Sequence, residues 1–381
     1  MDIAALPFDA DAMLQGLRPW IECESPTFDA AAVNRMMGLA ARDLAGMGAE
    51  IEPIAGRMGF GDCLRATFPH AGAGRPGILI LGHLDTVHPL GTLARLSFRR
   101  DGAVCYGPGI VDMKGGNFLA LEAIRQLQRA GIETHLPLSV LFTSDEEVGS
   151  PSTRDLIEAE ARRHAFVLVP EPAREDGGLV SGRYAIQRFN LETIGKPSHA
   201  GIRPGEGRSA LREMARRIIA IEEMSASDCT FSVGVIESGK WVNCVPSFCR
   251  AEALSMAKRQ ADLDRGVERM LAMSGVEHDV NFTVTRGVTR PVWEPSEATL
   301  AMFELAQGLG RALGMELSQA SAGGGSDGNF TGANGVATLD GLGAEGKGYH
   351  TLEEHIEVES LSRRGRLMAG LLATLGSENR N

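Results

Sequence analysis

Short apolar runs alternate with helix-spaced segments in the first part of the chain. The runs Gly77–Leu81, Leu138–Phe142 and Phe166–Val169 are continuous and apolar, which is typical of strands buried on both faces of a parallel sheet. Between them, Met113–Ala130 repeats apolar residues at helical spacing, and Ser152–Arg163 has the pattern of a polar helix. This order predicts an α/β fold with a mostly parallel sheet.

The pattern changes near Gly182. Tyr184–Ile194 is long and partly alternating, as in a half-exposed antiparallel strand. Further elements are predicted after it: helix Ser209–Met224, strands Phe231–Ile236 and Phe248–Ser255, helix Leu263–Met273 and strand Val280–Thr285. After Pro291 the helix–strand pattern returns. We therefore predict a discontinuous α/β domain, residues 1–181 and 291–381, with an inserted α+β domain of four strands and two helices, residues 182–290.

Acidic residues and histidines follow the predicted strands. In open parallel sheets, functional residues gather beyond the carboxyl ends of the strands. The residues at these positions, in a turn before a predicted helix and in a glycine-rich loop near the C-terminus, are His83, Asp85, Asp112, Glu146, Glu147, Glu171 and His350. Taken singly, each is an ordinary loop residue or helix cap. Together their carboxylates would repel one another and raise one another's pKa unless a cation lay between them.

The donor types predict the cation. Two imidazoles with several carboxylates suit Zn²⁺ or its first-row neighbours, Co²⁺ and Mn²⁺, better than calcium or magnesium. We therefore expect a site for divalent metal ions.

Composition excludes several functions. The net charge is −11, and no run of Lys and Arg exceeds a pair, which argues against nucleic-acid or anionic-membrane partners. No apolar stretch approaches the roughly 18 residues of a membrane span, and the first residues lack the pattern of a signal peptide. Six scattered cysteines without a C-x-x-C pair fit reduced thiols. These features predict a cytoplasmic protein.

Seven motifs carry a family resemblance. They are "GHLDTVHP", "YGPGIVDMKGG", "TSDEEVGS", "PEP", "GKPSHAG", "GGGSDGNF" and "GYHTLEE", in this order between residues 82 and 354. Together they resemble the dinuclear zinc aminoacylase/carboxypeptidase family, which includes glutamate carboxypeptidase, acetylornithine deacetylase and succinyl-diaminopimelate desuccinylase. The likeness is closest to the glutamate carboxypeptidase branch.

The resemblance implies a role for each polar residue. His83 and Glu171 would bind one metal ion, Glu147 and His350 the other, and Asp112 would bridge both. Asp85 would hydrogen-bond His83 and fix its tautomer. His88 matches no family role and is interpreted as a loop or pocket-rim residue. In relatives the peptide bond after the bridging Asp is cis, which implies a cis bond between Asp112 and Met113.

The implied reaction is hydrolysis of an amide bond. Glu146 would be the general base that takes a proton from a metal-activated water and delivers it to the departing amine. His199 of "GKPSHAG" would stabilise the oxyanion. Because His199 lies in the inserted domain, it would reach the metals by closure of that lid or from a partner subunit. The resemblance also implies a homodimer formed through the inserted domain.

The substrate is predicted less closely: a peptide or N-acyl amino acid that releases a free amino acid. Arg290 and Asn243 fall where the family places carboxylate-facing residues, and backbone N–H groups of Gly324 and Gly325 could join them. Arg286 is the rival of Arg290. Many relatives also carry an arginine where this chain reads Ala253–Met256, and its absence puts specificity for glutamate in doubt.

Three alternatives remain at this point. One is an N-acyl amino acid deacylase of the acetylornithine deacetylase type. The second is a serine hydrolase, because Gly324–Gly328 matches G-x-S-x-G around Ser326, and Asp340 and His350 follow in the order of a catalytic triad. The third is a metal-bound regulatory or scaffold protein on the same fold, although no predicted ligand or base is missing.

Overall fold

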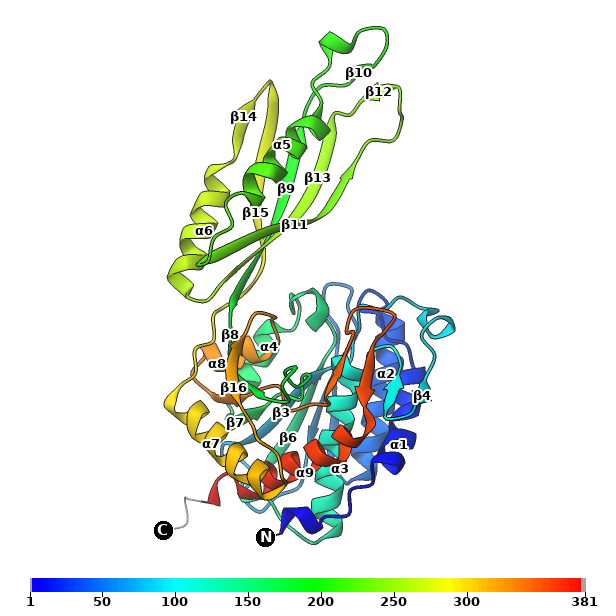
Figure 1. Ribbon diagram of the computed structural model, residues 1–381, viewed down its shortest axis with the longest axis vertical. Coiled ribbons are helices and arrows are strands. Elements are labelled where there is room, and N and C mark those ends of the chain that lie inside the picture. The colour runs from blue at the N-terminus through cyan, green and yellow to red at the C-terminus, as the bar shows by residue number, and fades with distance from the viewer. Residues whose placement is uncertain (1, 378–381) are drawn as a thin grey trace. The chain divides into compact units, whose positions relative to one another are not determined.

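The computed structural model describes residues 2–377, which divide into two compact units (Figure 1). The first unit comprises Met1–Gly182, Glu294–Ala322 and Ser326–Asn381, and the second Arg183–Trp293 with Gly323–Gly325. None of the helices within residues 2–377 combines the length and apolarity needed to cross a membrane.

The first unit is built on a six-stranded sheet. Its strands, in spatial order, are β1 (Glu50–Ile54), β2 (Cys63–Thr67), β6 (Leu138–Thr143), β3 (Gly77–His83), β7 (His164–Leu168) and β17 (Ala337–Leu339). The four strands from β6 to β17 are parallel to their neighbours, and β1 and β2 extend the sheet antiparallel. The protein is thus a mixed α/β fold with a mostly parallel sheet, as the sequence predicts.

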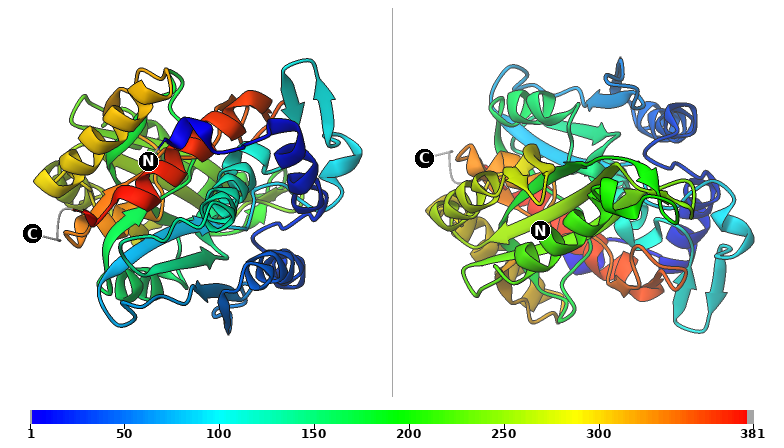
Figure 2. Two further views of the ribbon diagram at one scale, coloured as in Figure 1. Left: turned by 90° about the horizontal axis from the view of Figure 1, so that it is seen from below. Right: turned by 90° about the horizontal axis from the view of Figure 1, so that it is seen from above.

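Helices cover both faces of this sheet. One face carries α1 (Ala10–Glu22), α2 (Ala30–Gly46), α3 (Gly115–Arg129), α7 (Glu297–Ala312) and α9 (Val358–Thr374). The other carries α4 (Arg154–Ala161) and α8 (Gly328–Ala333). On the first face α9 lies beside α1 and α3, as the view from below shows (Figure 2, left).

The burial of strand β3 on both faces explains its continuous apolar sequence. Ile78 and Ile80 pack into the core of the first face, while Leu79 and Leu81 pack into that of the second. Every residue of β3 is buried. A strand covered on both faces must be apolar throughout, which is why it appears as a continuous run rather than an alternating one.

Two smaller sheets complete the first unit. A four-stranded sheet contains β18 (Gly346–Lys347), β19 (His355–Glu357), β5 (Val104–Tyr106) and β4 (Arg99–Asp101), in that order. A two-stranded ladder joins β16 (Gln319–Ala322) to β8 (Leu179–Arg183). The first of these sheets brings the chain around residue 350 next to the chain around residue 106, a proximity that sequence patterns did not predict.

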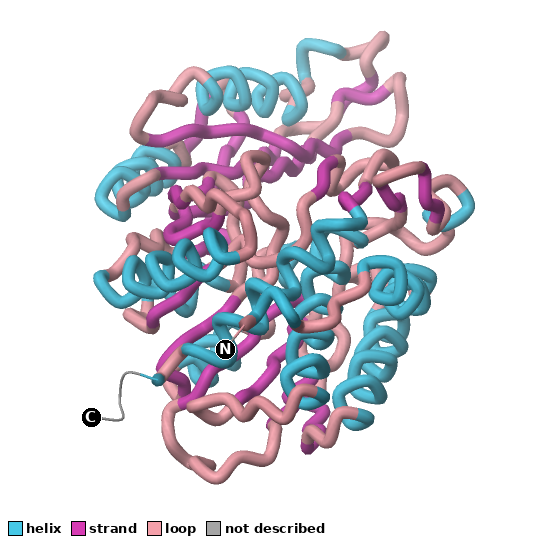
Figure 3. Tube along the Cα trace, turned by 60° about the horizontal axis from the view of Figure 1, so that its bottom comes forward, coloured by secondary structure: helices cyan, strands magenta, loops and turns pink. Residues whose placement is uncertain are grey.

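The second unit is an antiparallel sheet with two helices. Its strands, in spatial order, are β11 (Cys229–Ser238), β13 (Phe248–Ala257), β9 (Ala185–Ile194), β15 (Val280–Arg290) and β14 (Gly275–Glu277). Helices α5 (Ala210–Glu222) and α6 (Gln260–Ala272) share a core with the alternating buried positions of β9, such as Phe189 and Leu191. Figure 3 distinguishes the strands of both units from their helices.

The prediction of four strands for this unit was wrong by one strand in the main sheet. The additional strand, β14, has three exposed residues and pairs only with β15. So short a strand leaves no periodic signal. A further two-stranded ladder, β10 (Ser198–His199) with β12 (Cys244–Val245), lies outside the main sheet.

Helix α3 begins two residues later than predicted, at Gly115. The preceding segment, Ile110–Lys114, is an irregular turn in which Asp112 and Met113 have non-helical backbone angles. The Asp112–Met113 peptide bond is cis, as the family resemblance implies. The turn therefore delays the start of the helix and holds Asp112 outside it.

Candidate metal centre and active site

The predicted metal-binding residues all lie in the first unit. His83 is the last residue of β3, Glu146 and Glu147 follow β6, and Glu171 follows β7. Because these parallel strands end at one edge of the sheet, their loops converge there. Asp112 joins them from the turn before α3, and His350 from the loop between β18 and β19.

Close backbone packing positions Glu171. A Cβ atom at Gly116 would lie 1.9 Å from the carbonyl oxygen of Pro170, and one at Gly343 would lie 2.2 Å from the same oxygen. The Gly343 N–H also donates to the Glu171 carbonyl at 2.8 Å. Both glycines are therefore needed for the loop after β7 to lie against its neighbours.

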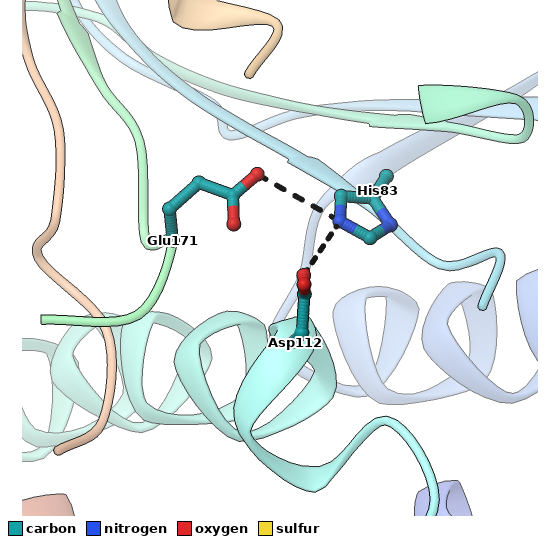
Figure 4. A group of neighbouring side chains, drawn as sticks. All are labelled: His83, Asp112 and Glu171. Atoms are coloured by element: carbon teal, nitrogen blue, oxygen red, sulfur yellow. Dashed lines mark hydrogen bonds and ion pairs between the residues drawn. The ribbon is translucent and has the colours of Figure 1, made fainter. Parts of the chain in front are cut away.

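The residues form two groups that share Asp112. In the first, His83 Nε2 lies 3.2 Å from Asp112 Oδ1 and 3.7 Å from Glu171 Oε1 (Figure 4). In the second, His350 Nε2 lies 3.2 Å from both Asp112 Oδ2 and Glu147 Oε2. Within each group the ligand atoms lie within 4.8 Å of one another. Asp112 thus presents one carboxylate oxygen to each group.

Burial and mutual repulsion perturb these groups strongly. Burial, and then the charge of Asp112, raises the pKa of Glu147 to about 8 and the pKa of Glu171 well above its ordinary value. Hydrogen bonds with Asp112 and Glu147 raise the pKa of His350 to about 10. Although burial alone would raise the pKa of Asp112, the bonds to His350 and His83 lower it. The crowded carboxylates therefore favour a positive charge among them, which a proton or a metal ion can supply.

The donor set fits dications. Ligands about 2.0–2.1 Å from a tetrahedral ion are about 3.3 Å apart, close to the three contacts of 3.2 Å made by the imidazoles. Each group offers one imidazole and two carboxylates, a mixture that suits Zn²⁺ and its first-row neighbours.

Glu146 belongs to neither group. Its Oε2 lies 3.9 Å from His83 Nε2, and only a tenth of its side chain is exposed. A carboxylate beside the ligands but outside both groups can exchange a proton with a water held there.

Asp85 contacts both His83 and the turn that follows β6. The closest contact of His83 Nδ1 is the backbone carbonyl of Asp85, at 3.0 Å, while the Asp85 carboxylate lies 3.4 Å away. Since a carbonyl only accepts, Nδ1 carries the hydrogen and Nε2 is left to bind metal. The Asp85 carboxylate also accepts from the backbone N–H groups of Glu146 and Glu147, at 3.2 and 3.3 Å, and from the Thr27 hydroxyl at 2.8 Å.

His88 lies in the loop after β3, as interpreted from the sequence, but sequence reasoning did not predict its burial or its partner. His88 is buried, and its Nε2 lies 2.6 Å from Glu354 Oε2. The two residues are far apart in sequence, so no local pattern could have paired them. Glu354 also contacts the backbone around Asp112, and sequence reasoning missed it altogether.

His199 and Asn243 lie together in the second unit. His199 is in β10, paired with Cys244 of β12, and the carbonyl of Asn243 accepts from Ala200 N–H at 2.9 Å. The backbone N–H groups of Gly201 and Ile202 both donate to His199 Nδ1 at 3.1 Å. In neutral His199 the hydrogen therefore lies on Nε2, which makes this exposed side chain a hydrogen-bond donor.

Arg290, Gly324 and Gly325 lie together at another place in the second unit. A Cβ atom at Gly325 would lie 2.7 Å from Arg290 Cδ. Arg183, which sequence reasoning missed, donates to the carbonyls of Gly324 and Gly325 at 2.7 and 3.3 Å. The rival Arg286 instead donates twice to Gln187 Oε1, at 3.1 and 2.8 Å.

The geometry of Ser326 argues against a serine hydrolase. Ser326 is fully buried, and its hydroxyl donates to Asp340 at 2.7 Å. A triad needs the histidine between the serine and the acid. His350 instead contacts Asp112 and Glu147.

Comparisons with known proteins bear on the family and the fold. Residues 79–374 match the model of peptidase family M20/M25/M40. The chain is 32% identical to Carboxypeptidase G2 of Pseudomonas sp. (strain RS-16), over 80% of this chain and 75% of that protein. It is 30% identical to acetylornithine deacetylase of Myxococcus xanthus, over 47% of this chain and 49% of that one. Among solved structures, the M20 family metallo-carboxypeptidase Sso-CP2 from Sulfolobus solfataricus has the same fold, with a TM-score of 0.75 at 14% identity, covering 95% of this chain and 98% of that one.

Proposed function

Because the chain belongs to peptidase family M20/M25/M40, a family of metal-dependent hydrolases of peptide and amide bonds, we propose that it is a dizinc enzyme releasing a free amino acid from a peptide or N-acyl amino acid. The observation that carries this proposal is the shared carboxylate of Asp112. Its two oxygens face two ligand groups, and each group contains one histidine and one further glutamate.

In this proposal the ligands divide as the geometry suggests. His83, Asp112 and Glu171 hold one ion, and Asp112, Glu147 and His350 hold the other. Dications held there would supply a water of lowered pKa and polarise the scissile carbonyl. Glu146 removes a proton from that water and later delivers it to the departing amine nitrogen. Asp85 orients Glu146 and Glu147 through their backbone N–H groups.

The substrate carboxylate is proposed to bind at the cluster of Arg290, Gly324 and Gly325, and the developing oxyanion to accept a hydrogen bond from His199. Asn243 lies beside His199 and would contact the same part of the substrate. A guanidinium is the side chain best matched to a carboxylate. His199 has its Nδ1 occupied as an acceptor, which leaves Nε2 to donate.

The length of β9 bears on how these residues meet one substrate. Arg290 pairs with Ile186 near the start of β9, whereas His199 comes after Ile194 at its other end. The eight residue steps from Ile186 to Ile194 span about 26 Å, while an extended dipeptide spans only about 7 Å. One chain therefore does not bring both residues to the same small substrate. We propose a homodimer in which the partner's His199 completes the site.

Mixing two inactive variants tests this assembly. Glu146→Ala and His199→Ala each lack one residue of the proposed machinery. If His199 acts between subunits, mixing and reassociation restore activity, because a mixed dimer has one site with both residues. A mixture as inactive as its components, or a monomer by light scattering at micromolar concentration, would contradict the proposal.

Substrate identity is tested with a panel of dipeptides and N-acyl amino acids, read by mass spectrometry. A carboxypeptidase prefers the dipeptides, whereas an enzyme like acetylornithine deacetylase prefers small N-acyl groups. Chelation should abolish turnover and zinc should restore it, and Glu146→Ala should be inactive with its zinc content unchanged. Glu353→Ala, which alters an exposed carboxylate near the site, is the control. Activity that survives complete metal removal, or that a serine-directed organophosphate abolishes, would refute the proposal.

A cytoplasmic location is also proposed, with small molecules rather than nucleic acids or membranes as partners. All six cysteines are free thiols in the described part of the chain, which fits a reducing compartment. The net charge of −11 disfavours binding to polyanions. Fractionation of the native host and a filter-binding assay with DNA would test the two parts separately.

A further inference from the structure

A buried carboxylate, Glu354, lies in the loop of His350 and contacts the segment that carries Asp112. Only 1% of Glu354 is exposed. It follows His350 by four residues, in the loop between β18 and β19. Neither ligand group includes it. A buried acid with no ligand role needs another explanation.

Both oxygens of Glu354 accept hydrogen bonds. Oε2 accepts from His88 Nε2 at 2.6 Å and from the backbone N–H of Gly109 at 2.8 Å. Oε1 accepts from the backbone N–H groups of Val111 and Asp112, at 2.9 and 3.2 Å. Three of the four donors therefore belong to the turn that presents Asp112 or to Gly109, the residue directly before it.

The backbone of Glu354 adds a further link between the same loops. Its carbonyl accepts from Gly107 N–H at 3.2 Å, and β19 directly after it pairs with β5 directly before the Asp112 turn. Glu354 thus fixes the Asp112 turn and the His350 loop to each other through both side chain and main chain. His88 holds the carboxylate from the loop after β3.

The two ligand groups depend on this connection unequally. In the first group, His83 is held by β3, and the loop of Glu171 is held against Gly116 and Gly343. In the second group, His350 is about half exposed and lies on a loop at a positive φ of 65°. The position of His350 relative to Asp112 therefore depends on the segment that Glu354 anchors.

We propose that Glu354, held by His88, is a positioning residue that sets the separation of Asp112 and His350 and thereby determines occupancy of the second metal position. This inference rests on the proposed dinuclear centre. According to this proposal, the His88–Glu354 pair controls the affinity for the ion bound by Asp112, Glu147 and His350. It has only a small effect on the affinity for the ion bound by His83 and Glu171.

The substitution Glu354→Gln tests the assignment with little change in volume. A carboxamide replaces one acceptor oxygen with an NH₂ donor. Either orientation of the amide then places a donor against a backbone N–H: that of Gly109, or those of Val111 and Asp112. At least one buried N–H loses its partner, and the turn can no longer pack as it does.

The experiment measures metal stoichiometry and affinity directly, by titrating metal-free protein with Zn²⁺ in competition with a chromogenic chelator. Wild type is expected to bind two ions. Glu353→Gln, which removes a neighbouring exposed carboxylate, is expected to bind both with the same affinities as wild type. Glu354→Gln is expected to bind the first ion nearly as wild type and the second about 10–100-fold more weakly. His88→Ala should show a smaller loss of the same kind, which His88→Gln, with its amide donor, should partly reverse.

The outcomes are distinguishable. If wild type binds fewer than two ions, the proposed dinuclear centre is wrong. If wild type binds two ions and Glu354→Gln binds both with unchanged affinity, or loses both equally, the positioning role is wrong. A thermal melt of each metal-free variant separates the cases further, because a purely structural role lowers the melting temperature without a selective loss of the second ion.

Discussion

Replacing Asp85 with asparagine should disorder the turn that carries Glu146 and Glu147. Asp85 is fully buried, and its Oδ1 and Oδ2 accept from the N–H groups of Glu146 and Glu147 respectively. Asparagine retains the shape but keeps only one acceptor oxygen. Whichever way its amide turns, one of these two N–H groups faces an NH₂ donor, whereas the Thr27 hydroxyl can rotate.

The magnitude follows from that single unpaired group. A buried N–H without a partner costs about 1–3 kcal/mol. If the free energy of locally opening the turn decreases by this amount, the amides of residues 144–150 should exchange about 5- to 150-fold faster. Hydrogen-exchange mass spectrometry of the metal-free protein measures this. Because Glu146 is the proposed base, kcat should fall as well.

Asp101→Asn is the matched control, because its carboxylate is largely exposed on β4. Exchange in residues 144–150 should be the same in this variant as in the wild type. Unchanged exchange in Asp85→Asn would show that the Asp85 bonds do not hold the turn. Faster exchange throughout the first unit would show that the substitution acts on global stability instead.

Three further outcomes are expected. Zn²⁺ binding near pH 7 should release protons and tighten as pH rises, because the pKa values of Glu147 and His350, about 8 and about 10, keep both protonated without metal. Calorimetry in buffers of different ionisation enthalpy measures the proton release, and finding none would contradict this expectation. Gly116→Ala should displace the loop of Glu171 and lower the zinc content, since the new Cβ would lie 1.9 Å from the Pro170 oxygen. Gly38→Ala, which adds a Cβ in open space on α2, should leave the zinc content unchanged, and equal zinc contents in the two variants would refute the packing argument. Ser326→Ala should lower stability by about 1–2 kcal/mol through its lost bond to Asp340 but leave kcat at the wild-type level, and loss of kcat in the folded variant would reopen the serine mechanism.

Sequence patterns predicted the elements whose burial is regular. Strand β3 is apolar throughout because it is covered on both faces, and β9 alternates because it is covered on one. Both patterns follow from the period of two in a strand. The three-residue strand β14 is too short to show any period, and it was missed.

Local sequence also predicted which polar residues converge, because strand ends in a parallel sheet share an edge. It could not predict how Asp85 and His88 are used. The Asp85 carboxylate bonds to the turn that follows β6, and His88 bonds to Glu354 near the other end of the chain. Such contacts depend on tertiary packing, and a single sequence holds no record of them.

Arg183 illustrates the same limit. It lies at the end of β8 and donates to the carbonyls of Gly324 and Gly325, about 140 residues further along the chain. A lone arginine before a strand is an ordinary surface residue by sequence. Only the ladder between β8 and β16 brings the glycine-rich segment next to it.

The position of β17 has a consequence for synthesis of the chain. Strand β17 covers the outer edge of β7, yet about 170 residues separate Leu168 from Ala337. At about 5–20 residues per second, the hydrogen-bonding edge of β7 stays uncovered on the ribosome for about 10–30 seconds while the second unit is made. During this interval the nascent sheet offers an open strand edge to other chains. The insertion therefore creates a period of exposure to aggregation during translation, which ends only when β17 emerges.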